Sequence, residues 1–130
     1  MLTKRDKEIL KFIEKYKSIT IRQAKYLFFK KSYEGARRRL AELEKFGLLK
    51  SSISKARSEK VFYAEKMISD HDLYKIDYIV NLKKMGFEII EFNSKPSYFD
   101  NQLKPDAFVV CRKNGYRYII FLEIDYTHYT

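Results

Sequence analysis

Three consecutive arginines, Arg37, Arg38 and Arg39, form the densest cluster of positive charge in this sequence. A guanidinium group can hold a phosphate, or the edge of a guanine base, through two parallel hydrogen bonds. The apolar residues around the arginines recur at helical spacing, so the segment predicts a helix that presents cations to an anionic partner. Because such a helix fits the major groove of a duplex, double-stranded nucleic acid is the leading candidate partner.

The positive charge of the whole chain is concentrated in its first half. Residues 1–66 contain 19 Lys and Arg against 8 Asp and Glu, a net charge of +11. Residues 67–130 contain 8 against 9, a net charge of −1. Few acids are therefore available to compensate the cations of the first half. A basic region beside a nearly neutral one is typical of a protein that binds a polyanion.

The basic half contains three segments with helical spacing. Thr3 with Asp6 and Thr20 with Gln23 are capping boxes that begin the first two helices. Ser32 caps the third helix, which ends before a glycine at position 47. The apolar residues predicted to face the core of these helices are Ile9, Phe12, Ile13, Tyr16, Ala24, Leu27, Phe28, Tyr33, Ala36, Leu40 and Leu43.

Two short strands, 48–51 and 60–63, follow the third helix and are separated by a polar, basic loop. Three helices followed by a hairpin is the order of a winged helix-turn-helix, in which the third helix reads the major groove and the wing contacts the backbone. We predict an α+β fold, with this winged helix over 1–66 and a small α/β unit containing a β-hairpin over 67–130. The predicted DNA-binding residues are Lys31, Ser32, Tyr33, Arg37, Arg38, Lys45, Lys55, Arg57 and Lys60.

The second half predicts one helix and a small sheet. Helical spacing covers 72–85, and a strand is expected over 87–92. Two further apolar strands, 106–111 and 116–125, flank an Asn-Gly pair that is typical of a two-residue type I′ turn. The predicted helix has two open interpretations: it makes a homodimer, or it packs on the sheet of its own chain.

Three carboxylates are brought together by this predicted hairpin. With a two-residue turn, the numbers of paired residues sum to 229, so Asp106 lies opposite Glu123 and Asp125 follows on the same side. Like charges that face each other cost stability, so the group would need a cation, a shared proton or solvent. Asp106, Glu123 and Asp125 are weak candidates for a magnesium site, and His128 is a candidate further ligand or proton carrier.

The same residues carry a resemblance to known families. Pro105-Asp106, two apolar strands and Glu123-Ile124-Asp125 resemble the core of the PD-(D/E)xK nuclease fold. Together with the winged helix, the ending KPDAFVV … YIIFLEIDYT resembles the replication-relaxation family of plasmids, phages and integrative elements. The resemblance implies an accessory role in replication or conjugative DNA relaxation. Its implied partners are a relaxase, a replication initiator or another protein of the element.

Several functional alternatives stay open at this stage. The nuclease pattern has a lysine where this chain has Asp125, so we predict no catalytic activity and no cofactor. The alternatives to an accessory replication protein are a transcriptional regulator of the element, a magnesium-dependent nuclease and a winged helix that binds protein. The single cysteine, Cys111, lies in an apolar run and predicts a buried thiol. Without a long apolar segment, we expect a cytoplasmic protein that does not bind membranes.

Overall fold

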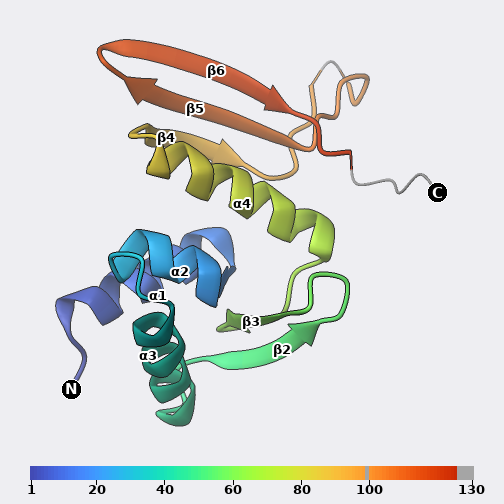
Figure 1. Ribbon diagram of the computed structural model, residues 1–130. Helices are drawn as coiled ribbons and strands as arrows, with labels where there is room; N and C mark the ends of the chain where they lie inside the picture. The colour runs from blue at the N-terminus through green and yellow to red at the C-terminus, as the bar shows by residue number, and fades with distance from the viewer. Residues whose placement is uncertain (99, 126–130) are drawn as a thin grey trace. The chain divides into compact units, whose positions relative to one another are not determined.

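The computed structural model describes residues 1–98 and 100–125 (Figure 1). Its fold is α+β, as predicted, with four helices and two antiparallel three-stranded sheets in this part of the chain. The chain divides into two compact units, the first covering Met1–Asp70 and the second beginning at His71. The division thus falls after Asp70 rather than after residue 66. Within the described residues, no helix is long and apolar enough to cross a membrane.

The first unit has the topology of a winged helix. The sheet order is β1-β3-β2, with both pairings antiparallel. Strand β1 was not predicted, because three residues are too few to display an alternating pattern. The elements of this unit are α1 (Lys4–Tyr16), β1 (Ser18–Thr20), α2 (Ile21–Phe28), α3 (Tyr33–Lys45), β2 (Lys50–Ser54) and β3 (Glu59–Tyr63).

Both predicted capping boxes are confirmed. The backbone N–H of Asp6 donates to the Thr3 hydroxyl at 3.1 Å, and the backbone N–H of Thr3 donates to the Asp6 carboxylate at 2.8 Å. Thr20 and Gln23 make the same reciprocal pair at 3.0 and 3.1 Å. Each box satisfies N–H groups that the first turn of a helix leaves without an intrahelical partner. The starts of α1 and α2 are therefore set by residues next to them in sequence.

The core of the first unit follows the predicted apolar positions with one clear exception. Tyr33 was expected to face inward, but half of its surface is exposed, 50%. It is the first residue of α3, where the helix has not yet reached its packing partner, and Phe29 from the preceding turn is buried instead. Leu27 and Phe28 are only half-buried. The fully buried positions that were predicted are Ile9, Phe12, Ile13, Tyr16, Ala24, Ala36, Leu40 and Leu43.

The second unit consists of one helix and a sheet with strand order β4-β5-β6. The predicted hairpin register is confirmed: β5 and β6 pair from Lys113↔Tyr116 to Ala107↔Leu122, so that paired numbers sum to 229. Both turn residues have positive φ, 53° and 81°, as a type I′ turn requires. The elements are α4 (Asp70–Lys84), β4 (Glu88–Asn93), β5 (Ala107–Lys113) and β6 (Tyr116–Leu122).

The two faces of this sheet differ in burial. Alternate residues of β5, namely Ala107, Val109 and Cys111, are fully buried, and α4 lies along one side of the sheet (Figure 1). Burial also raises the pKa of the Cys111 thiol, which agrees with the inert side chain expected from the sequence. On the opposite face Phe108 and Val110 of β5 are half-buried, and most of β6 is exposed.

Candidate nucleic-acid interface

Helix α3 is held in place by its cap and by one apolar face. The Ser32 hydroxyl accepts a hydrogen bond from the backbone N–H of Gly35 at 3.0 Å, which begins the helix. Ala36, Leu40 and Leu43 are fully buried beneath it. The other faces of α3 are consequently turned to solvent. They carry four of the nine residues predicted to bind DNA, namely Tyr33, Arg37, Arg38 and Lys45.

The three consecutive arginines have three different environments. Arg37 is exposed and forms an ion pair with Glu34, its Nε lying 2.8 Å from the carboxylate. Arg38 is exposed, and among the described residues its side chain makes no hydrogen bond or ion pair. Arg39 is only 17% exposed and binds Asp6 of α1. Adjacent arginines on a helix point about 100° apart, so a single run of charge serves different contacts.

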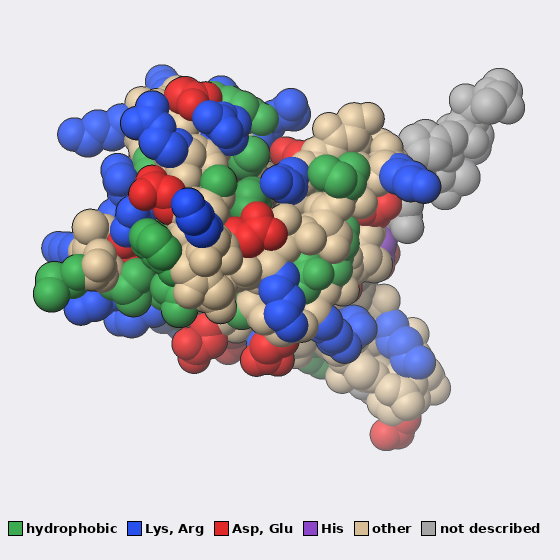
Figure 2. Space-filling model, turned by 90° about the horizontal axis from the view of Figure 1, so that it is seen from below, with side chains coloured by type: hydrophobic (Ala, Val, Ile, Leu, Met, Phe, Trp, Pro, Cys, Tyr) green, Lys and Arg blue, Asp and Glu red, His purple; other side chains and the backbone are tan. Residues whose placement is uncertain are grey.

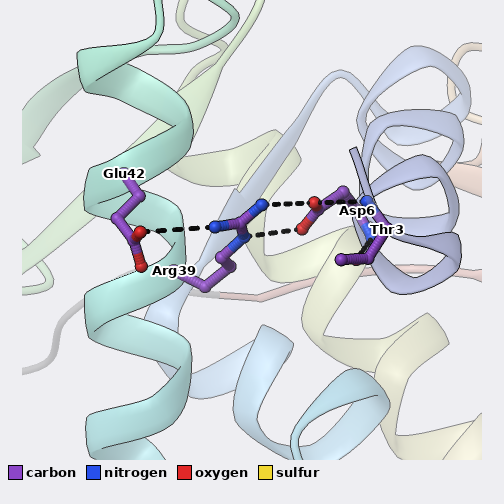
Figure 3. Close-up of polar contacts among 4 residues, drawn as sticks. All are labelled: Thr3, Asp6, Arg39 and Glu42. Carbon is purple, nitrogen blue, oxygen red and sulfur yellow. Dashed lines mark hydrogen bonds and ion pairs between the residues drawn. The ribbon is translucent and has the colours of Figure 1, made fainter. Parts of the chain in front are cut away.

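The ion pair of Arg39 and Asp6 joins α3 to the start of α1 (Figure 3). Arg39 Nε and Nη2 lie 2.8 and 2.5 Å from the two oxygens of Asp6, a bidentate arrangement. Arg39 Nη1 also reaches Glu42 at 3.3 Å. The carboxylate of Asp6 is fully buried and additionally accepts from Thr3. Arg39 therefore has a structural role in orienting α3.

The electrostatics of this pair are visible in the pKa of Asp6. Hydrogen bonds from Arg39 hold the pKa of the Asp6 carboxyl well below its usual range, and those of Thr3 act in the same direction. Burial alone would raise this pKa, so the donors outweigh the loss of solvation. A buried carboxylate that stays charged depends on its partners. The charge of Asp6 is thus balanced by Arg39 within the fold.

Two exposed cations lie at or near the start of α3. Lys31 and Arg38 are exposed, and neither makes an ion pair within the described part of the chain. A hollow of about 370 Å³ between the starts of α1 and α3 is lined by Arg38 and also by Arg5. The Arg5 guanidinium stacks over the ring of Phe29, 4.1 Å from its centroid. Arg5 was missed from the sequence because it lies 33 residues before Arg38.

The wing exposes two of the three cations predicted to bind DNA and covers the third. Lys55 and Lys60 are exposed. The side chain of Arg57, by contrast, is only 9% exposed and pairs with Glu59 at 3.0 Å. Its Nε also donates to Glu59 at 3.1 Å. Arg57 therefore stabilises the wing hairpin and does not present a free cation to a phosphate.

Short polar contacts fix the wing relative to α3 within the first unit. The Ser51 hydroxyl of β2 donates to Glu44 of α3 at 2.7 Å. The Ser54 hydroxyl donates to Asp70 at 2.6 Å and accepts from the backbone N–H of Arg57. The Ser51 bond joins the hairpin to α3, and the Ser54 bonds stabilise the end of β2. Simultaneous contact with a groove and a backbone would require the helix and the hairpin to be joined in this way.

The remaining predicted residues are all on the surface. Ser32, Tyr33 and Lys45 are exposed, the first two at the start of α3 and the third in its last turn. Figure 2 shows lysine and arginine side chains spread over the face seen from below, most densely at its left, with single acidic side chains between them. The expectation of few compensating acids needs correction, since Asp6, Glu34 and Glu59 each neutralise an arginine.

The carboxylates of the second unit do not form the predicted group. Within the described residues, no three His, Cys, Asp or Glu side chains lie where they could hold a metal ion. Asp106 instead accepts a hydrogen bond from the backbone N–H of Ile124 at 2.6 Å and lies 3.4 Å from His71. Glu123 and Asp125 are exposed, and His128 lies outside the described residues. The hairpin register was predicted correctly, but the Asp106 carboxylate is hydrogen-bonded to the backbone of Ile124 across the hairpin.

No protein-family model, no curated protein and no solved structure matches this chain. The resemblance to the replication-relaxation family therefore stays a prediction, and the functional argument depends on the geometry of the chain itself.

Proposed function

We propose that this protein binds double-stranded DNA through the start of α3 in the major groove and through the wing on the phosphate backbone. The observation that carries the proposal is a set of exposed cations whose side chains make no hydrogen bond or ion pair within the described residues, above all Lys31 and Arg38, with Arg38 lining a hollow that Arg5 also lines. Helix starts favour anions, and the topology of the first unit is the one in which such a helix enters a groove.

The biological setting that we propose follows the sequence resemblance. The protein would act in the cytoplasm as an accessory to replication or conjugative DNA relaxation of a mobile element, without catalysis of its own. A transcriptional regulator would use the same surface, since operator and origin recognition need the same contacts. The position of the cognate site, in a promoter or beside an origin, separates the two roles.

The proposal is tested by the anisotropy of labelled duplex DNA titrated with the full chain. We expect binding that Arg38→Ala weakens by about tenfold, because a direct contact of arginine to a base or phosphate is lost. Arg112→Ala serves as the control, since it removes the same charge from an exposed site in the second unit. An equal loss in both variants would mean that α3 is not the contact surface. Excess unrelated DNA shows whether the binding depends on sequence.

A further inference from the structure

Strand β6 forms an exposed edge of the sheet in the second unit (Figure 1). In the described part of the chain its ladder partner is β5, and the outer side of its backbone faces no other strand. Unpaired N–H and C=O groups along such an edge are a template for pairing with another strand. The edge is seven residues long, which is above the usual length of a strand.

The side chains of β6 leave this edge unprotected. Ile119 is 62% exposed and Phe121 51%, and Arg117 is the one charged residue of the strand. The opposite edge, β4, is different: it carries Glu88 and Glu91 and a β-bulge between Ile89 and Glu91. Charges and bulges are the usual means of blocking edge pairing. The structure thus protects one edge of the sheet and leaves the other open.

We propose that β6 pairs with the β6 of a second copy of this chain, antiparallel and centred on Ile119. In this register Arg117 of each copy lies opposite Phe121 of the other, and Tyr118 lies opposite Ile120. The two Arg117 side chains are then about 14 Å apart along the strands, so no like charges face each other. Each cation instead meets an aromatic ring, which is a favourable contact. The edge is complementary to itself.

The distribution of charge favours a second copy as the occupant. Residues 71–130 contain 8 Lys and Arg and 8 Asp and Glu, so two such units meet without net repulsion. Residues 1–70 contain 19 against 9, a net charge of +10, and would repel one another. Association through the second unit also leaves the cations of the first unit free.

The oligomeric state of the full chain in solution, measured by sedimentation across a concentration series without DNA, tests this pairing. We expect a dimer that Ile119→Lys weakens by about tenfold or more, since two ammonium groups would meet at the centre of the interface. Ile90→Lys is the matched control, because it places the same charge at an exposed isoleucine of the protected edge and should leave the dimer intact. A monomeric protein, or equal effects of the two variants, overturns the proposal.

Cross-linking tests the register without relying on the stability of a charged variant. Ile119→Cys should form a disulfide between copies under mild oxidation, since the two residues face each other directly. Tyr116→Cys, three residues from the centre, should not, and Cys111 is buried and does not interfere. Preferential cross-linking at position 116 would contradict the pairing. Neither experiment involves DNA, so each outcome is independent of the proposed function.

Discussion

Arg37 in the first unit and Arg112 in the second are nearly identical as isolated ion pairs. Their side chains are 51% and 50% exposed, and each binds a glutamate that is 56% exposed. What differs is the surroundings. Arg37 lies next to the exposed Arg38 in a unit of net charge +10, and Arg112 lies in a unit with no net charge. The comparison teaches that an exposed ion pair does not by itself indicate a binding surface for a polyanion. The net charge of the surrounding unit decides whether a polyanion is attracted.

A second contrast lies within the run of arginines. Arg39 is covered and bound to the buried Asp6, whereas its neighbour Arg38 is exposed. One residue therefore supports the position of α3, and the other is available for a ligand. The two roles predict that substitution by alanine affects stability strongly at Arg39 and weakly at Arg38.

The largest expected effect is that of Arg39→Ala on stability. Removing the partner of a buried carboxylate should lower the free energy of unfolding by about 3 kcal/mol. Arg38→Ala should change it by less than about 0.5 kcal/mol, because the side chain is on the surface. Urea unfolding followed by circular dichroism measures both. Similar losses of stability in the two variants would contradict the claim that Arg39 supports the fold and Arg38 does not.

The same ion pair gives a pH dependence whose sign follows from Asp6. Its pKa is lowered in the folded state, mainly by Arg39, so the unfolded chain binds a proton more readily. The stabilisation is complete above the usual pKa of aspartate and is lost as the pH falls toward the folded value. Stability should decline between pH 5 and pH 2 more steeply in the unmodified chain than in Asp6→Asn, as chemical unfolding at a series of pH values would show. Parallel curves would contradict the assignment.

A smaller effect on DNA affinity compares the two exposed ion pairs, Arg37–Glu34 and Arg112–Glu88, directly. Arg37→Ala should weaken binding to duplex DNA by about fivefold, because a cation beside the contact surface is lost. Arg112→Ala should leave the affinity unchanged within error. Anisotropy titrations at one salt concentration are sufficient for this comparison. If both variants bind equally well, the local field of the first unit is not what attracts DNA.

The smallest expected effect is a gain of affinity. Glu34→Gln removes an acid from the first turn of α3 and releases Arg37 from its ion pair. Binding to DNA should therefore strengthen by about threefold. Glu88→Gln makes the same change beside Arg112 and should have no effect. Weaker binding by Glu34→Gln would mean that Glu34 itself makes a useful contact with a base.

Local chemistry made much of the fold predictable. The capping boxes at Thr3 and Thr20 and the Asn-Gly turn each depend on residues adjacent in sequence, and all three appear as expected. The predicted strand over 48–51 was placed too early, because Gly47 at φ 85° is followed by a turn in which Leu48 N–H donates to Leu43. β2 consequently begins at Lys50.

The partners of charged residues were the part that could not be predicted. Asp6 was recognised as a helix cap, but its contact with Arg39 spans 33 residues and depends on how α1 and α3 pack. Arg57 was interpreted as a free cation because its loop is basic, although Glu59 lies two residues away and covers it. The hydrogen bond of the Asp106 carboxylate to the backbone of Ile124 likewise could not be predicted from the strand register. Composition identifies an excess of charge, and tertiary contacts decide which charges remain free.

The most direct test of the central claim is the affinity of the full chain for duplex DNA over a series of salt concentrations. If the exposed cations of the first unit neutralise some five or six phosphates, the logarithm of the affinity should fall with the logarithm of the salt concentration at a slope of about −4 to −6. The slope should become shallower by about one unit in Arg38→Ala and remain unchanged in Arg112→Ala. An affinity that does not respond to salt would contradict the account.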